Sequence, residues 1–272
     1  MSSARDESWW HGRLQRSSIG RGYPIVLTVA HTTSSGADAF QAILSSGEVY
    51  WVKAMGNRQG DVALVNEFVV GKIADHLGAC VRPRQIVMLP DELCRERFKP
   101  PSVLRPVSGP AHGSLHLENA VEVEEGFEYR DRDSNTEREV GIYALWDLCL
   151  GQDEQWLYDS AADYSVWSFD HSLWFAVQGE EWDQHMCRTL VDRPWGVNEA
   201  DYPVDNLSAS TFHSYAEKLR DITPADLLAI LAAVPTEWGK SDRDLEVLGW
   251  MLYRRSRGVA QRLVDLASRA RL

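Results

Sequence analysis

The spacing of apolar and polar residues predicts strands in the first third of the chain. Residues 24–32 (PIVLTVAHT) are rich in β-branched residues and predict a strand. Residues 38–44 (DAFQAIL) and 49–55 (VYWVKAM), joined by SSGE, predict an antiparallel hairpin. Residues 82–90 (RPRQIVMLP) predict a further strand that is entered and left through prolines.

A helix is predicted between the hairpin and that last strand. It runs from Asp61, a residue type that favours the N-cap, to Leu77, and Gly78 takes the position of a C-terminal cap. Residues 91–110 mix charges and prolines and predict an irregular connection. Residues 112–125 (HGSLHLENAVEVEE) predict another strand-like stretch, in which valines alternate with acidic residues.

Helical spacing dominates the second half of the chain. Residues 126–140 are charged and poor in apolar side chains, which predicts a surface loop. Residues 141–150 follow helical spacing, and residues 164–169 have strand character. Three further helices are predicted, at 208–219, 224–234 and 242–269. Strands come first and helices later, so we expect a two-lobed α+β protein rather than alternating βαβ units.

Composition and charge narrow the class of protein. With 272 residues and 44% hydrophobic content, the chain can bury a substantial core and is ordinary for a soluble protein. The net charge of −12 argues against direct nucleic-acid binding and against an anionic membrane surface, although it leaves room for one local basic pocket for phosphates. No run of about 18 apolar residues occurs, so no membrane span is expected.

The ends and the cysteines predict a cytoplasmic location. The first 18 residues are polar and charged and lack the apolar core of a signal peptide. The four cysteines are widely spaced, without a C-x-x-C pair. We therefore expect a reducing compartment and no disulfide framework.

Two charged residues, Lys53 and Glu67, stand on otherwise apolar faces. Val49, Trp51 and Lys53 share one face of the predicted strand. Glu67 lies on a helix stripe whose other members are small or apolar: Ala63, Val70, Gly71 and Ala74. An unpaired buried charge is strongly unfavourable, so we predict that Lys53 and Glu67 meet, as the strand lysine and helix glutamate do beside ATP in kinase folds. The alternative is an edge-strand lysine in solvent and an ordinary surface glutamate.

Two aspartates further along the chain strengthen the first interpretation. Asp153 lies in a loop just after a predicted helix, and Asp170 follows a predicted strand 17 residues later. In kinases, a catalytic-loop aspartate orients or deprotonates the attacking hydroxyl, and a later aspartate holds Mg²⁺ against the phosphates. Aspartates are common in loops, so this pair gains its value from following Lys53 and Glu67 in the expected order.

Residues 52–78 resemble the HipA-like kinases, a bacterial family with a protein-kinase and lipid-kinase type fold. That family carries a strand lysine, a G-N-x-Q-G-like loop and an A-L-x-N-E helix. The matching residues are Lys53, Gly56, Asn57, Gln59, Gly60, Ala63, Leu64, Asn66 and Glu67. Downstream, residues 167–175 (WSFDHSLWF) resemble the family's strand ending in I-D-H, with Asp170 and His171 in place.

The resemblance implies a bilobed protein-kinase-like fold. A β-rich N-lobe would span residues 23–115 and a mainly helical C-lobe residues 116–272. Residues 1–22 would form a poorly ordered or loosely docked lead-in.

The resemblance also implies ATP and Mg²⁺ as cofactors and a role for each site residue. Lys53 would hold the α- and β-phosphates, with Glu67 fixing the lysine. Asp170 would bind Mg²⁺, and Asp153 would position the acceptor hydroxyl. The remaining ATP-binding residues would be Ser34, Ser35 and Gly36, which cover the phosphates, and Glu118 and Ala120 in a hinge (LENA) against adenine.

The catalytic loop departs from the family pattern. The family's loop reads D-R-H-x-x-N, in which the asparagine is a second metal ligand, whereas this chain reads DEQWLYD from Asp153 to Asp159. Five residues after Asp153 stands Tyr158, and a shortened loop would put Trp156 in that place; neither binds a metal. Asp159 could substitute as an oxygen ligand, as could Gln155 if the loop folds differently.

The expected function is ATP- and Mg²⁺-dependent phosphotransfer, with a protein serine or threonine hydroxyl as the acceptor that the family implies. Small-molecule and lipid acceptors remain open, because a fold does not fix the acceptor. The alternative is a nucleotide-binding pseudokinase that acts as a scaffold or regulator.

Overall fold

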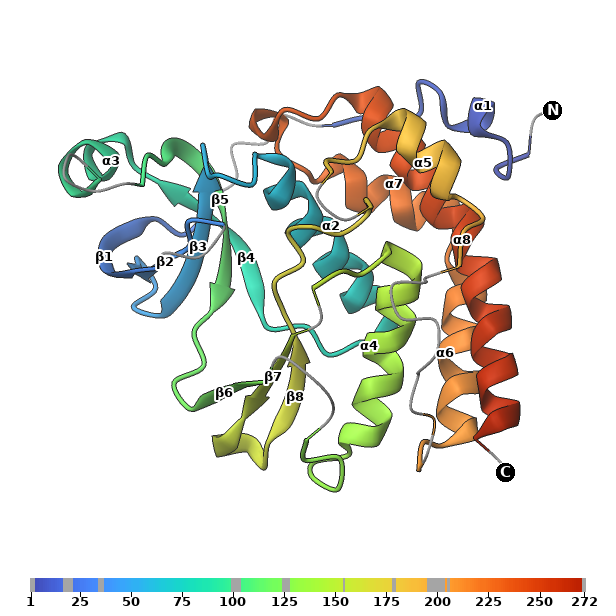
Figure 1. Cartoon of the computed structure of the whole chain (residues 1–272). Coiled ribbons are helices and arrows are strands. Elements are labelled where there is room, and N and C mark those ends of the chain that lie inside the picture. Colours follow the sequence, from blue (N-terminus) through green and yellow to red (C-terminus); the bar gives the residue numbers. More distant parts are fainter. Residues whose placement is uncertain are drawn as a thin grey trace.

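A five-stranded antiparallel sheet forms one side of the computed structural model of the chain (Figure 1). The residues described are 3–16, 22–33, 37–98, 104–123, 128–153, 155–177, 180–194, 204 and 206–270. The strands of the sheet are β1 (Val26–Thr32), β2 (Phe40–Leu44), β3 (Val49–Met55), β4 (Arg84–Leu89) and β5 (Val107–Leu115), in the order β1-β2-β3-β5-β4. The predicted hairpin is confirmed, because β2 pairs with β3 and Phe40 lies opposite Val52.

The two faces of β3 have different surroundings. Its even-numbered residues from Tyr50 to Ala54 are buried in a small core that belongs to the sheet. Val49, Trp51 and Lys53 are half-buried on the opposite face. The strand therefore presents Lys53 away from the core of the sheet, as strand alternation predicts.

The helix that carries Glu67, α2 (Val62–Leu77), lies between the sheet and the other helices (Figure 1). Gly78 ends it in the left-handed region, at φ 67°, and donates its N–H to the carbonyls of Ala74 and Asp75, as predicted. Asp61 takes the predicted N-cap position of α2, but its side chain makes no cap hydrogen bond. Its carboxylate accepts the Gly56 N–H at 2.8 Å and so braces the loop before the helix.

A larger core lies among the helices of the second part of the chain. These helices are α4 (Asn135–Cys149), α5 (Gln184–Leu190), α6 (Ala209–Asp221), α7 (Pro224–Ala232) and α8 (Asp242–Arg269), with the 3-10 turn η2 (Thr236–Trp238) before α8. The three predicted C-terminal helices are confirmed as α6, α7 and α8. The Thr223 hydroxyl caps α7 by accepting the Asp226 N–H.

A small second sheet lies next to the two candidate aspartates, Asp153 and Asp170. It consists of β6 (Ala120–Val123), β7 (Trp156–Asp159) and β8 (Ser165–Ser168), with the 3-10 turn η1 (Ser160–Ala162) between the last two. β7 and β8 are antiparallel, with Trp156 opposite Ser168 and Asp159 opposite Ser165.

The loops predicted at residues 91–110 and 126–140 are wrong in part, and the strand-like stretch predicted at 112–125 is confirmed as parts of two strands. Residues 91–110 contain α3 (Asp91–Arg97) and the start of β5; no residue of α3 is buried, so it shows no apolar period. Residues 112–125 divide between β5 and β6, which belong to different sheets. The charged stretch 126–140 contains the first turns of α4, where the buried Asn135 side chain donates to the carbonyls of Tyr129 and Tyr164 and accepts the Val166 N–H.

The expectation of a loosely docked lead-in is wrong for residues 3–16. They include α1 (Glu7–Trp10), and the Trp10 side chain is fully buried in the larger core. The Trp250 indole of α8 donates to the Arg5 carbonyl at 2.9 Å. The N-terminal segment is therefore packed against α8.

Two further properties concern the whole of the described chain. Among the described helices, none has a stretch long and apolar enough to cross a bilayer. The four cysteines, at 80, 94, 149 and 187, carry free thiols, and the last two are buried.

Candidate active site

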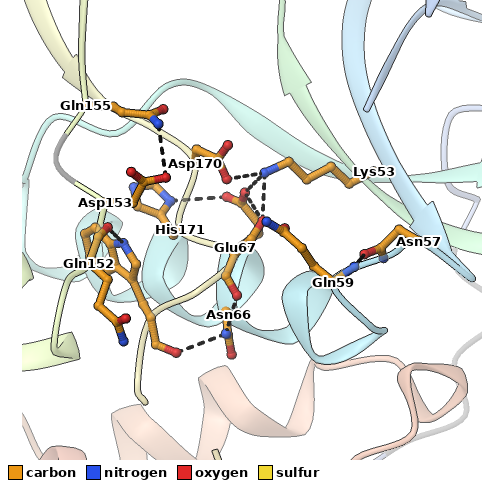
Figure 2. Close-up of polar contacts among 12 residues, drawn as sticks. Lys53, Asn57, Gln59, Asn66, Glu67, Gln152, Asp153, Gln155, Asp170 and His171 are labelled. Atoms are coloured by element: carbon orange, nitrogen blue, oxygen red, sulfur yellow. Dashed lines mark hydrogen bonds and ion pairs between the residues drawn. The ribbon is translucent and has the colours of Figure 1, made fainter. Parts of the chain in front are cut away.

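Lys53 lies at the centre of a polar network between the sheet and α2 (Figure 2). Its Nζ donates to Glu67 Oε1, to Asp170 Oδ1 at 2.6 Å and to the Ser172 hydroxyl at 2.8 Å. The side chain of Lys53 is 13% exposed and that of Glu67 4%. The prediction that Lys53 and Glu67 meet is confirmed, and the solvent-exposed alternative is wrong.

The network keeps both members of the ion pair charged. Burial alone would lower the pKa of Lys53, but the carboxylates of Asp170 and Glu67 outweigh it, and the net pKa is raised. Burial would likewise raise the pKa of Glu67, but Lys53 and His171 hold that carboxyl well below its usual range. The site therefore presents a fixed ammonium group between two carboxylates near neutral pH.

A second layer of side chains holds Glu67 in place. Its Oε2 lies 3.2 Å from His171 Nδ1, and its Oε1 accepts the Ser172 hydroxyl at 3.2 Å. The other ring nitrogen of His171 lies 3.0 Å from the Ser168 hydroxyl at the end of β8. His171 thus orients the carboxylate that in turn fixes Lys53.

Asn66 connects α2 to the segment that follows Asp170. Its amide nitrogen donates to the carbonyls of Ser172 at 2.7 Å and Trp174 at 3.0 Å. Its amide oxygen accepts the Trp182 indole N–H at 2.7 Å. Asn66 is 2% exposed, so this bridge is part of the interior and fixes the backbone next to Asp170.

The G-N-x-Q-G pattern of the loop between β3 and α2, from Gly56 to Gly60, is explained by the conformation of the loop. Gly56 and Gly60 have φ values of 76° and 80°, in the left-handed region that glycine tolerates best. A Cβ on Gly56 would also lie 3.0 Å from the Arg105 carbonyl. The buried Asn57 closes the turn, because its side chain donates to the Ala54 carbonyl and accepts the Gln59 N–H, both at 2.9 Å.

The start of β7 and the end of β8 bring the two aspartates to one end of the small sheet. Asp153 precedes β7 by three residues and Asp170 follows β8 by two. Both have positive φ, 59° and 55°. Strained backbone of this kind concentrates at functional sites.

The loop that carries Asp153 is tied to the segment after Asp170. The Gln152 amide donates to the carbonyls of Leu173, at 3.0 Å, and Ala176, while the Trp174 indole donates back to the Gln152 carbonyl at 3.1 Å. The Phe175 N–H, on a residue with φ 70°, donates to the Cys149 carbonyl. The two halves of the site therefore form one hydrogen-bonded unit.

The structure decides among the candidates for the missing asparagine. Trp156 is fully buried and stacks on Trp146, with ring centroids 5.5 Å apart, and Tyr158 is also buried. Asp159 lies at the opposite end of β7 from Asp153, where its carboxylate caps η1 through the Ala161 N–H. The expectation that Asp159 binds a metal beside Asp170 is therefore wrong.

Gln155 is the polar side chain that the loop places next to Asp153. It directly precedes β7, and its amide nitrogen donates to Asp153 Oδ2 at 3.1 Å (Figure 2). The donated N–H leaves its amide oxygen as the group that can act as a ligand.

The predicted adenine and phosphate contacts have different outcomes. Glu118 lies exposed between β5 of the large sheet and β6 of the small one, where a hinge is expected, and the exposed Ala120 is the first residue of β6. Ser34, Ser35 and Gly36 lie outside the described residues.

Trp51, two residues before Lys53 on the same face, donates its indole N–H to His116 Nδ1 at 3.2 Å. It adds an aromatic ring to this face of the sheet.

The sequence matches the family of HipA-like kinases over residues 26–251. The chain belongs to this family. The match spans both sheets, α2 and most of the helical part, so the network around Lys53 lies within the HipA-like kinase region.

Solved structures of kinases share the fold. The crystal structure of the Helicobacter pylori proinflammatory kinase CtkA has a TM-score of 0.53 and 12% identity, covering 89% of this chain and 95% of that one. The crystal structure of the golgi casein kinase has a TM-score of 0.50 and 13% identity, covering 89% and 73%. No curated protein matches the sequence. This HipA-like kinase therefore has the expected bilobed kinase-like fold.

Several residues of the network escaped the sequence analysis of this HipA-like kinase. Gln152, Trp174 and Trp182 act through backbone carbonyls and indole N–H groups, whereas the Ser172 hydroxyl accepts a hydrogen bond from Lys53. Only the position of Ser172, next to the I-D-H-like motif, could have drawn attention to it.

Proposed function

We propose that this HipA-like kinase transfers the γ-phosphoryl group of ATP to a serine or threonine hydroxyl of a protein. The observation that carries the proposal is the placement of Lys53 between Glu67 and Asp170. Kinase catalysis requires the strand lysine paired with the helix glutamate, and the metal-binding aspartate close by. The free protein already holds that arrangement, so no rearrangement of α2 is needed before nucleotide binds.

The roles of the residues follow from their positions. Lys53 would bind α- and β-phosphate oxygens, exchanging its contact with Asp170 for them while it keeps Glu67. Asp153, exposed at the start of the small sheet, would accept the proton of the attacking hydroxyl or orient it. Gln155, hydrogen-bonded to Asp153, would hold that carboxylate in position.

The donor set fits Mg²⁺ that is held mainly by phosphates. Within the described residues, no cluster of three histidine, cysteine or acidic side chains forms a ready-made metal cage. Mg²⁺ commonly uses only one or two protein oxygens together with substrate phosphates and water. Asp170, with its side chain 32% exposed, and the Gln155 amide oxygen supply oxygens of that kind. When bound, the metal would neutralise charge on the β- and γ-phosphates.

A protein acceptor is the choice that the comparisons favour. One of the similar solved structures is named a casein kinase, which points to a protein substrate for that enzyme. A net charge of −12 disfavours an anionic lipid surface as the acceptor.

The test is incubation of the purified protein with γ-labelled ATP and magnesium, alone and with lysate proteins. Asp153→Ala should reduce labelling by about a hundredfold or more, the usual contribution of a positioned base. Asp163→Ala is the matched control, since Asp163 is an exposed loop aspartate that also has positive φ (49°). Equal labelling by wild type and Asp153→Ala would disprove the role of Asp153.

The second candidate is a nucleotide-binding pseudokinase, and the loop itself favours it. Tyr158 stands where the family's metal-binding asparagine is expected, and both Tyr158 and Trp156 are fully buried. This candidate predicts binding without turnover. A saturable shift of the melting temperature with Mg²⁺ and ATP, corresponding to about 2.7 kcal/mol at one hundred times Kd, would then accompany an absence of labelling. An absence of any shift would exclude both candidates.

A further inference from the structure

A pocket rich in arginine lies on the helical lobe, outside the site around Lys53. Its volume is about 280 Å³, and its walls come from the N-terminal segment, the residues after α5 and one face of α8. Six arginines line it: Arg5, Arg193, Arg254, Arg255, Arg257 and Arg262. No lysine is found among the described residues that form its wall.

The charge of this pocket is opposite to that of the protein. The chain carries 40 acidic and 28 basic residues, for a net charge of −12. Asp192 is the one carboxylate among the residues that line the pocket, and its side chain is 73% exposed. A concentration of positive charge against such a background raises the local concentration of anions.

The floor of the pocket is rigid. The Arg255 side chain is 1% exposed and donates to the carbonyls of Leu148 at 3.0 Å and Leu190 at 2.8 Å. Arg262 forms a two-pronged pair with the buried Asp147 carboxylate, at 2.6 and 2.7 Å. Asp147 also lies 3.3 Å from Arg255, so this one carboxylate is shared by two guanidinium groups.

Three other guanidinium groups at the pocket are weakly paired, whereas that of Arg257 donates to the Ile222 carbonyl at 3.0 Å and lies over the Tyr253 ring. For Arg5 and Arg193, the described part of the chain shows no side-chain hydrogen bond or ion pair. Arg254 contacts the exposed Asp192 at 3.2 Å. Like charges held together without counter-charges repel one another, and a bound anion would remove that repulsion.

Gly258 of α8 is one of the residues that line the pocket. Gly258 lies one turn after Arg254 and one turn before Arg262, on the same face of the helix. Glycine in a helix interior costs about 1 kcal/mol relative to alanine. A Cβ at this position would lie 3.3 Å from the Arg262 Nη1, within the space that the guanidinium groups surround.

We propose that this arginine pocket binds a phosphate group, supplied either by free inorganic phosphate or by a phosphorylated side chain of a protein. The guanidinium fork matches phosphate oxygens with paired N–H donors, which favours arginine over lysine at such sites. The proposal does not depend on catalysis at Lys53, because the pocket is built from other elements.

The test uses titration calorimetry on the full chain at constant ionic strength in chloride. The probes are inorganic phosphate, a phosphoserine peptide and the same peptide without phosphate. Arg5→Ala/Arg193→Ala should weaken phosphate binding at least tenfold. Arg97→Ala/Arg220→Ala is the charge-matched control, with two exposed arginines elsewhere, and should bind within twofold of wild type.

Two further variants distinguish phosphate binding in this pocket from general charge attraction and from binding at the ATP site. Gly258→Ala keeps every charge and favours the helix, so it should fold and yet bind phosphate more weakly. Lys53→Met, measured at a temperature at which urea unfolding shows it to be folded, should retain phosphate binding, because the ATP site is elsewhere. Tighter binding of the phosphopeptide than of inorganic phosphate, with the same dependence on Arg5 and Arg193, identifies a phosphoprotein as the source; the reverse order identifies the free anion.

Three results with the phosphate-bearing probes would overturn the proposal. The first is that neither phosphate-bearing probe binds saturably. The second is that Arg5→Ala/Arg193→Ala binds phosphate as tightly as the wild type, and the third is that the folded Lys53→Met variant no longer binds phosphate. The unphosphorylated peptide binding as well as the phosphopeptide would also contradict it.

Discussion

Replacing Lys53 by methionine should destabilise the protein, and replacing Glu67 by glutamine as well should recover part of the loss. Lys53→Met leaves the Glu67 carboxylate, whose side chain is 4% exposed, without its cation. Breaking a buried ion pair from one side costs about 3–5 kcal/mol. Glu67 keeps its contacts with His171 and Ser172, so we expect the lower end, about 3 kcal/mol.

The reciprocal change should cost less. In Glu67→Gln, Lys53 keeps Asp170 at 2.6 Å and Ser172 at 2.8 Å, and it loses one charged hydrogen bond worth about 2 kcal/mol. Independent effects would add to about 5 kcal/mol. In the double variant neither charge is stranded, so we expect about 2 kcal/mol, less than for Lys53→Met alone, and a coupling of about 3 kcal/mol.

The assay is urea unfolding of the wild type and the three variants at pH 7, without nucleotide. Lys53→Met should also regain stability at lower pH. Without Lys53, burial raises the pKa of Glu67 in the folded state above its unfolded value, so the folded protein takes up a proton as the pH falls. The double variant lacks that carboxyl and should not show the gain. Additivity of the two substitutions within about 0.5 kcal/mol would refute direct pairing in solution.

Three other substitutions test the surroundings of the site. Asn66→Ala leaves the Trp182 indole and two carbonyls without their hydrogen-bond partner, so it should lower the free energy of unfolding in urea by about 2–4 kcal/mol. The control Asn119→Ala, at an exposed position, should change it little. Equal effects of the two substitutions would contradict the buried bridge. Burial, opposed by Arg130, raises the pKa of Glu139 to about 7 from 4.5, so its contribution to stability is complete below pH 4.5 and is lost as the pH rises to 7. The stability difference between wild type and Glu139→Gln should therefore change by about 3 kcal/mol over that window, and a constant difference would refute the shift. Gly141→Ala would put a methyl group into the Tyr215 ring and should cost about 1–3 kcal/mol by thermal unfolding, an expectation that an unchanged melting temperature would contradict.

The fold could be predicted where one face of an element is apolar and the other is not. The alternation in β2 and β3, and the long amphipathic period of α8, follow directly from that asymmetry. The prediction of secondary structure failed where an element lacks this difference between an apolar and a polar face. No residue of α3 is buried, and the first turns of α4 bury the polar residues Asn135 and Glu139, whose residue types suggest a loop.

The site could be predicted as far as charge alone decides it. A lysine and a glutamate on apolar faces require each other, and the structure pairs them. The partners that bind through main-chain atoms could not be found in this way. The contacts of Gln152 and Asn66 with carbonyls depend on how the chain turns after Asp170, and residue types alone do not reveal such turns.

The catalytic loop shows why a motif has to be interpreted together with the strand that follows it. Counting residues from Asp153 led to Tyr158 or Trp156, and oxygen chemistry led to Asp159. The stacking of Trp156 on Trp146 fixes where β7 begins, and this placement sends Asp159 to the far end of the strand. Gln155 is the last residue before β7, and its side chain contacts Asp153. Among the described residues of this loop, its amide oxygen is the counterpart of the asparagine oxygen that binds the second metal in the family. In the proposed function, the Gln155 amide oxygen, which is one methylene further from the backbone than that of an asparagine, would take this role.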